Sequence, residues 1–356
     1  MLAKLLMEGD GMLSRAAILP TPGDPFLNKF WFKMFEKNWQ DEVDKLYVLV
    51  NSQIEEPVVE FLRKMYETNP KVKFFYVEHM IEHGKALAFL LDMVEEELVM
   101  LIEDDGLIFK PGAVKEQFDR IEAGEFDVIG GHRQSSTPDI AKAVQHTFFT
   151  ESMESFLWPN FLFTKTKYLK NTDRNFGAVG FKKGELVPFV NQVFETDQAM
   201  DTFGWATIQL YAQNLNIDFI EQYHAMAEDA MFYEQKQRMW DGKCKWTHWG
   251  SLSGMMTNFL LDRKGRPLEN RTKVLDEKDP YDIKNSDNID SEGVRMDFES
   301  RIANIMLAYE QTEKECDEIS DFREEYKEAI DRVISVFRLD QSRIHNKTRI
   351  YKELML

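Results

Sequence analysis

Apolar and polar residues alternate in blocks along residues 15–131. Short apolar runs of strand length alternate with longer segments in which apolar residues recur every three or four positions, as on one face of a helix. The predicted strands cover 16–19, 45–50, 72–77, 98–102 and 126–129, and the predicted helices cover 25–38, 57–68, 84–95 and 114–121. Strands that alternate with helices predict right-handed crossovers and a mostly parallel, doubly wound α/β sheet.

The remainder of the chain has a different pattern. Residues 132–250 are less regular and rich in aromatic side chains, with a predicted helix over 195–214 and a predicted strand over 217–221. A polar stretch with turn signals follows, and two amphipathic stripes come after it. We therefore expect one large domain over 1–260 with halves at 15–131 and 132–260, a linker or extended arm over 261–294, and a helical region over 295–356.

Composition and charge narrow the class of protein. Of the 356 residues, 43% are hydrophobic and 30% are charged, as in ordinary soluble globular proteins. The formal net charge of −18 argues against a non-specific binder of nucleic acid or of an anionic membrane, while a local basic groove for nucleic acid stays open. Cys244 and Cys316 lie far apart without metal-ligand spacing, which indicates a reducing compartment. Met1–Arg15 lacks a signal-peptide core, and no apolar run approaches the roughly 20 residues of a membrane span, so we expect a cytoplasmic protein.

The stretch 98–106 carries the most chemical information. An apolar run of strand length ends in Glu103, Asp104, Asp105 and Gly106. Ligands of α/β proteins bind at the carboxyl ends of the strands, so these carboxylates would face a binding site. Neighbouring carboxylates repel one another and favour a hard divalent cation such as Mg²⁺ or Mn²⁺. The alternative is a surface turn, in which Asp and Gly are ordinary residues.

Several motifs in order give the chain a resemblance to a known family. They are the strand end Ile18-Leu19-Pro20-Thr21, the strand end Asn51-Ser52, the helix start His83-Gly84-Lys85-Ala86-Leu87-Ala88 and the acidic run Glu103-Asp104-Asp105. Together they resemble the GT-A glycosyltransferases of the family 2 type, over about the first two thirds of the chain. The resemblance implies a Rossmann-like GT-A fold with a C-terminal helical extension. In that fold, 15–131 would bind the nucleotide sugar and 132–260 the acceptor.

The same resemblance implies an activity and a donor. The chain would be a metal-dependent, hexosyltransferase-type enzyme that moves a sugar from a nucleotide-diphosphate sugar to an acceptor hydroxyl, inverting by direct displacement. Asp105 would contact Mn²⁺ or Mg²⁺, and Asp104 would contact the ribose or the sugar. Glu103 stands where the family prefers Asp, so it would act on the metal directly or through water.

Further site residues follow from the resemblance. Thr21 and Asn51 lie where the family holds the nucleoside, and Lys85 would reach a phosphate from the start of its helix. Lys85 could equally be a solvated helix lysine. His248, or less well His224, would complete the metal shell, the alternative for His248 being a loop histidine packed between tryptophans.

An inverting transferase also needs a general base. The resemblance makes Asp197 the first choice, Glu195 the second and Asp201 the third. The alternative is that Thr196 or Asp197 caps a helix without catalysis.

Other functions are weighed against this one. A nucleotidyltransferase would carry a Gly-rich, Arg-containing loop where this chain has Pro20-Thr21-Pro22-Gly23-Asp24. A dinucleotide-dependent dehydrogenase would carry Gly-x-Gly-x-x-Gly after its first strand. A non-catalytic sugar-nucleotide-binding scaffold stays open, as do the donor base, the sugar and the acceptor. The C-terminal helices would pack on the catalytic domain or pair between subunits as a homo-oligomer.

Overall fold

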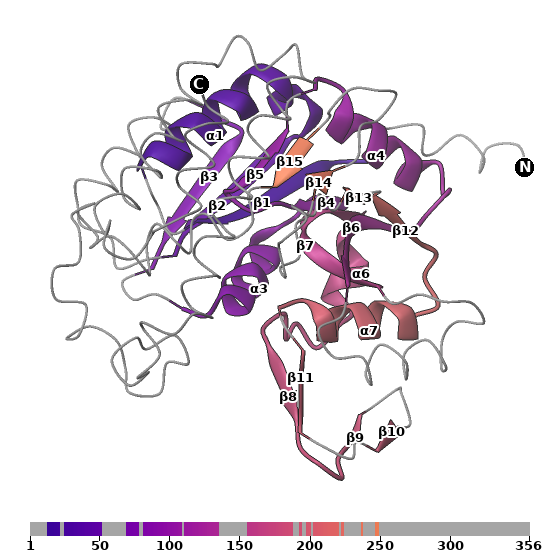
Figure 1. Cartoon of the computed structure of the whole chain (residues 1–356). Helices are drawn as coiled ribbons and strands as arrows, with labels where there is room; N and C mark the ends of the chain where they lie inside the picture. Colours follow the sequence, from indigo (N-terminus) through magenta and orange to yellow (C-terminus); the bar gives the residue numbers. More distant parts are fainter. Residues whose placement is uncertain are drawn as a thin grey trace, which may run out of the picture.

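The computed structural model describes the part of the chain that forms the sheet and its nearest helices. The described residues are 13–21, 25–51, 69–77, 81–108, 110–134, 155–187, 192–193, 197–200, 202–220, 222–223, 236–237 and 246–248. They form an α/β fold around one large sheet (Figure 1). The predicted helix over 57–68, the linker over 261–294 and the helical region over 295–356 lie outside the described residues. None of the helices within the described ranges is long and apolar enough to cross a membrane.

The central sheet has seven strands in the order β12-β6-β7-β4-β1-β2-β3. Their bounds are β1 Arg15–Thr21, β2 Lys45–Val50, β3 Val72–Tyr76, β4 Leu98–Leu101, β6 Val128–Gln134, β7 Ser155–Lys165 and β12 Ile217–Ile220. Neighbouring strands are parallel, except that β7 runs antiparallel to both β4 and β6. The predicted mostly parallel sheet is confirmed. Its antiparallel member, β7, lies in the less regular, aromatic-rich stretch that follows residue 131.

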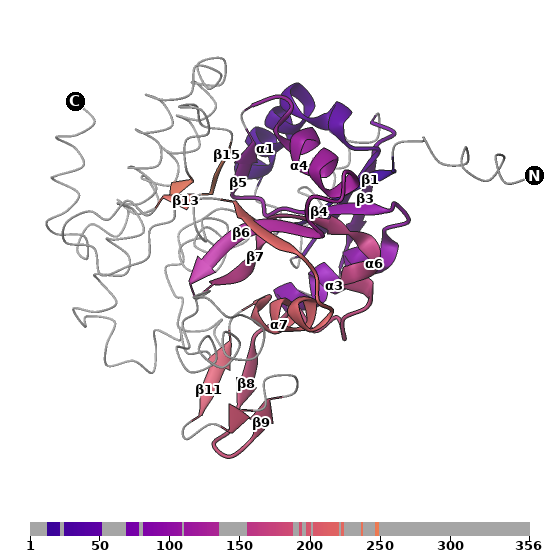
Figure 2. The ribbon, with the colours of Figure 1, turned by 90° about the vertical axis from the view of Figure 1, so that its right-hand side faces the viewer.

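Side chains of β1 alternate between the two faces of the sheet, and both faces are covered. Ala16 and Ile18 belong to a buried cluster on the face of α3 (His83–Met93). Arg15 points to the opposite face, where its guanidinium lies 5.5 Å from the ring centroid of Phe118 in α4 (Ala113–Glu122). Figure 2 shows α1 (Pro25–Asn38) and α4 on one side of the sheet and α3, α6 (Thr166–Lys170) and α7 (Gly204–Ala212) on the other. The predicted doubly wound arrangement is therefore present.

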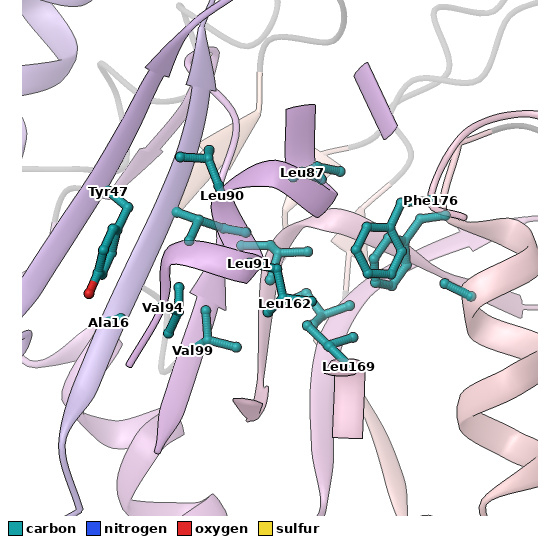
Figure 3. Close-up of a cluster of buried hydrophobic side chains, with 14 of the residues drawn as sticks. Ala16, Tyr47, Leu87, Leu90, Leu91, Val94, Val99, Leu162, Leu169 and Phe176 are labelled. Atoms are coloured by element: carbon teal, nitrogen blue, oxygen red, sulfur yellow. The ribbon is translucent and has the colours of Figure 1, made fainter. Parts of the chain in front are cut away.

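The buried cluster under α3 holds this helix against the sheet. Leu87, Leu90 and Leu91 recur at helical spacing and are fully buried with Val99 of β4 and Leu162 of β7 (Figure 3). Burial of each such side chain contributes about 1.5–3 kcal/mol. This packing fixes the N-terminal end of α3 beside the carboxyl ends of the parallel strands.

Residues 195–214 do not form the single helix that their sequence predicts. β11 (Gln198–Met200) instead pairs with β8 (Val179–Phe181) as an antiparallel ribbon, and α7 begins only at Gly204. Phe203, directly before α7, has φ +69°, so the backbone turns through the left-handed region there. A single residue with positive φ does not change the spacing of apolar residues over 195–214. The hydrophobic pattern therefore does not reveal the turn at Phe203.

The other described elements are short. They are η1 Gln40–Glu42, β5 Gly106–Ile108, β9 Leu186–Val187, β10 Gln192–Val193, β13 Gln222–Tyr223, β14 Lys236–Gln237 and β15 Trp246–His248. The antiparallel pair of β5 with β15 matters most, because β5 begins directly after the acidic run.

Candidate functional site

The acidic run forms a buried turn at the end of β4, between β1 and β7 in the sheet. The chain turns after Leu101, and the N–H of Gly106 donates to the carbonyl of Glu103 at 3.0 Å. Asp104 and Asp105 are only 3% and 2% exposed. Buried carboxylates carry a large desolvation cost unless donors or a cation offset it. The burial therefore distinguishes this turn from an ordinary surface turn.

Asp104 is held by β1 and α1. Thr21, the last residue of β1, donates its hydroxyl to Asp104 Oδ2 at 2.8 Å. Asn28 of α1 donates from Nδ2 to Thr21 Oγ1 at 2.9 Å. Thr21 and Asn28 are both buried, so the relay from Asn28 through Thr21 to Asp104 lies inside the protein. The structure thus brings Thr21 to the acidic run and adds Asn28, which the sequence did not single out.

Glu103 is held by α3 and β7. Its Oε2 accepts a hydrogen bond from Trp158 Nε1 at 3.1 Å, and its Oε1 lies 3.2 Å from His83 Nε2. Its backbone N–H donates to Asn160 Oδ1 at 3.1 Å. Both carboxylate oxygens of Glu103 therefore lie beside nitrogen atoms of the protein itself.

Strand β7 bends where it meets the acidic turn. Asn160 is 3% exposed, and a Cβ added to Gly106 would lie 2.4 Å from its Oδ1. Phe161 has φ +54°, and the register between β6 and β7 shifts in this part of the pair. A glycine at 106 and a bulge at 160–161 together allow the amide to reach the Glu103 N–H.

The carboxylates also act electrostatically on His83. Burial alone would lower the pKa of His83, but its hydrogen bond and charge interaction with Glu103, together with the charges of Asp104 and Asp105, raise that pKa above its ordinary value. The turn therefore favours positive charge near it, as a cation site requires.

His248 approaches the same turn through β15. The antiparallel register sets His248 opposite Gly106, the residue after Asp105. Paired Cα atoms of antiparallel strands lie about 4.5–5.5 Å apart, so the backbone of His248 is next to the turn. Trp31 of α1 donates from Nε1 to the carbonyl of Gly106 at 2.9 Å and so fixes the start of β5.

The two other donor-side candidates lie at the same edge of the sheet. Asn51, at the end of β2, donates from Nδ2 to the carbonyl of Ile81 at 2.7 Å and accepts the N–H of Ile81 at 2.9 Å. Its side chain thus ties β2 to the segment that leads into α3. Lys85 lies exposed in the first turn of α3.

The base candidates are less close to this turn. Asp197 is exposed, accepts the N–H of Lys183 at 2.9 Å and pairs with Lys182 Nζ at 2.9 Å. These two contacts hold the pKa of Asp197 below its ordinary value. Both ribbon views show the β8–β11 ribbon, which Asp197 adjoins, beyond α7 and apart from β5 and β15 (Figures 1 and 2). Glu195, Asp201 and His224 lie outside the described residues.

The donor set of the turn fits a hard divalent ion that shares its ligands with a substrate. Carboxylates at Asp105 and Glu103 are oxygen ligands of the kind that Mg²⁺ and Mn²⁺ bind. Within the described side chains, no three His, Cys, Asp or Glu groups converge as a complete metal site. Mg²⁺ commonly retains waters and takes phosphate oxygens, so a full protein cage is not required.

Five residues that contact the acidic run or Gly106, directly or through Thr21, were not among the sequence candidates for these roles. They are Asn28, Trp31, His83, Trp158 and Asn160. His83 stands in the motif at the helix start, directly before Gly84, and Asn160 with Pro159 interrupts an otherwise apolar strand. A Pro-Asn pair inside an apolar run indicates a bulge, which is the signal that could have located Asn160.

Comparisons with known proteins give only distant likenesses. No family model and no curated protein matches the chain. Solved structures that match include a mannosyltransferase from Pyrobaculum calidifontis in complex with GDP-Man and Mn²⁺, with TM-score 0.35 and 13% identity over 48% of this chain and 51% of that one. S. aureus TarS 1–349 in complex with UDP has TM-score 0.35 and 17% identity, over 58% of this chain and 57% of that one. Another structure of TarS 1–349 has TM-score 0.39 and 14% identity, over 92% and 89%.

The chain thus covers about half of the mannosyltransferase. Likenesses of this size do not decide what the chain does. Its function has to come from its own residues.

Proposed function

We propose that this chain is a metal-dependent glycosyltransferase that uses a nucleotide-diphosphate sugar. The observation that carries the proposal is the burial of Asp104 and Asp105 at the end of a central strand in a mostly parallel sheet. This edge of an α/β sheet is where ligands bind, and buried carboxylates there call for a cation. The motif order around them, from Thr21 to the acidic run, supports a nucleotide-sugar donor.

Different residues of the site would contact different parts of the donor. Asp105 and His248 would hold Mn²⁺ or Mg²⁺, and Glu103 would act on the ion through water or by orienting the turn. The ion would act as a Lewis acid that stabilises negative charge on a leaving diphosphate. Asp104 would accept a hydrogen bond from the ribose or the sugar, while the Thr21 hydroxyl donates to its Oδ2 and holds the carboxylate in place.

The nucleoside and phosphates would lie along the same edge. Asn51 and Thr21 border the nucleoside end, and Lys85 offers its ammonium to a phosphate at the start of α3.

The transfer step needs one proton acceptor. A carboxylate takes the proton from the acceptor hydroxyl as the hydroxyl oxygen bonds to the anomeric carbon and the bond from that carbon to the diphosphate oxygen breaks. The resulting product has inverted configuration, and the nucleoside diphosphate leaves with the bonding electrons. By the family resemblance, Asp197 is the first candidate for this base and Glu195 the second.

A thermal-shift panel tests the donor class. The wild-type chain is heated with UDP-, GDP- and other nucleotide sugars, with and without Mn²⁺. We expect one donor class to raise Tm only when Mn²⁺ is present, by mass action on the folded state. Asp105→Asn should abolish that metal-dependent shift. Asp127→Asn, at a carboxylate that accepts Tyr168 and Asn216 away from the turn, should keep it.

No metal-dependent shift with any nucleotide sugar would contradict the proposal. A shift that persists in Asp105→Asn would contradict the assignment of the metal to this turn. Binding without any turnover on any acceptor would favour a non-catalytic sugar-nucleotide-binding protein.

A further inference from the structure

The carboxylate of Glu103 lies in a clamp made by two elements that are distant in the sequence. On one side the indole of Trp158, in β7, donates to Oε2 at 3.1 Å. On the other side His83, the first residue of α3, places Nε2 3.2 Å from Oε1. The Glu103 side chain is 18% exposed, so these contacts are partly shielded from water.

We propose that Glu103 is a positioning residue, which His83 and Trp158 hold so that the acidic turn presents Asp105 to a divalent ion. This role rests on the proposed function of the turn as a metal–diphosphate site. The hydrogen bond from Trp158 and the ion-pair contact with His83 restrict the orientation of this carboxylate, and Asn160 holds the backbone N–H of the same residue. Groups that orient ligands in this way change metal affinity by about 10–100-fold when they are removed.

The position of His83 is itself fixed by tight backbone packing. A Cβ added to Gly84 would lie 2.1 Å from the backbone nitrogen of Gly177, and one added to Gly177 would lie 2.1 Å from Glu82 Oε1. The first turn of α3 is therefore locked against the chain near Phe176, which in turn packs in the core under the sheet. The backbone of His83 cannot shift without moving α3, so the clamp connects the acidic turn to a rigid element.

The other side of the turn is equally constrained. Asn160 accepts the Glu103 N–H, and its Nδ2 is buried without a hydrogen-bond partner among the described residues. An unsatisfied buried donor is destabilising, and a protein tolerates it where it fixes the geometry of a site. The amide thus sets the backbone of Glu103 while Trp158 and His83 set its side chain.

The test measures Mn²⁺ binding by the full chain, from the electron paramagnetic resonance signal of free Mn²⁺, with and without nucleoside diphosphate. Trp158→Phe keeps an aromatic ring but removes the indole N–H donor, and His83→Ala removes the imidazole. We expect each to raise the Kd for Mn²⁺ by about 10–100-fold. His83→Gln, which keeps an N–H donor of similar reach, should recover most of the loss.

Matched controls separate positioning from general stability. Trp205→Phe removes a comparable indole hydrogen bond, to Asp173 Oδ2 at 2.8 Å away from the turn, and should leave the Kd unchanged. Urea unfolding of each variant identifies any that fail to fold. Because Trp158 acts through Glu103, the double variant Glu103→Gln/Trp158→Phe should bind no more weakly than Glu103→Gln alone.

Three outcomes would overturn the role. An unchanged Kd in Trp158→Phe and in His83→Ala, with a weakened Glu103→Gln, would mean that Glu103 meets the ion unaided. Additive losses in the double variant would mean that Trp158 acts independently of Glu103. Absence of Mn²⁺ binding in the wild type, or wild-type affinity in Asp105→Asn, would overturn the proposed function and this role with it.

Discussion

Thr21 is the residue through which the core of the fold stabilises the acidic turn. Replacing it by Val keeps the shape of the side chain and removes the hydroxyl. The hydrogen bonds that disappear include the one to Asp104 Oδ2 at 2.8 Å and the one from Asn28 Nδ2 at 2.9 Å. A hydrogen bond to a charged group contributes about 1.5–3 kcal/mol and a neutral one about 0.5–1.5 kcal/mol. We therefore expect the free energy of unfolding to fall by about 2–4.5 kcal/mol. That is a large share of the 5–15 kcal/mol typical of a domain.

Equilibrium unfolding in urea measures this loss, provided that the slope m is unchanged. Thr21→Ser keeps the hydroxyl and loses one methyl group, which should cost only about 1 kcal/mol. Thr166→Val removes a hydroxyl that donates to the neutral carbonyl of Glu96 at 2.7 Å, and should cost about 0.5–1.5 kcal/mol. If Thr21→Val costs no more than Thr166→Val, the reasoning about a buried, charge-assisted bond at this site is refuted.

Two further predictions concern packing and pH. Gly84→Ala should destabilise the fold by several kcal/mol, because the new Cβ would lie 2.1 Å from the backbone nitrogen of Gly177. Gly124→Ala has open space around the new Cβ but a φ of +72°, so it should cost only about 1–2 kcal/mol. Equal urea midpoints for the two variants would contradict this. Burial would raise the pKa of Asp173, but hydrogen bonds from Gln209, Trp205 and the Asn175 N–H lower it below its ordinary 3.8. This contribution to stability is therefore present above about pH 3.8 and is lost as the pH falls through the folded-state pKa. Unfolding free energies of wild type and Asp173→Asn should converge on acidification, and a constant difference would contradict the assignment.

The strands that carry the site could be predicted because their ends are marked in the sequence. The apolar runs of β1, β2 and β4, the last of which continues to Ile102, are long enough to be buried, and polar or turn residues follow each run. Buried parallel strands read as continuous apolar runs. Because the strands alternate with helices, the sequence also predicts that the strands run parallel, and this needs no information about long-range contacts.

The partners inside the site could not be predicted in the same way. His83 and Trp158 meet at Glu103 only because the tertiary fold brings both α3 and β7 to the acidic turn. Pro159 and Asn160 break the apolar pattern of β7, so the strand does not read as a core strand. The register that sets His248 opposite Gly106 depends on a pairing between segments far apart in the chain, which local patterns do not encode.

Asn51 shows that a residue at the expected place can have another task. Sequence position at the end of β2 places it where a nucleoside would be held. The structure shows its amide bonded in both directions to the backbone of Ile81. Asn51→Ala therefore affects the approach to α3 as well as any nucleotide, and nucleotide affinity has to be measured on variants shown to be folded.

In the function proposed here, the buried turn at Asp104 and Asp105 binds a divalent ion that promotes loss of a nucleoside diphosphate from a sugar. The most direct measurement is the release of nucleoside diphosphate from the donor selected by the thermal-shift panel, with wild type and Asp105→Asn compared. We predict release by the wild type that stops with EDTA, returns with excess Mn²⁺ or Mg²⁺, and is lost in Asp105→Asn. Release that continues in EDTA, or that Asp105→Asn leaves unchanged, would contradict the account.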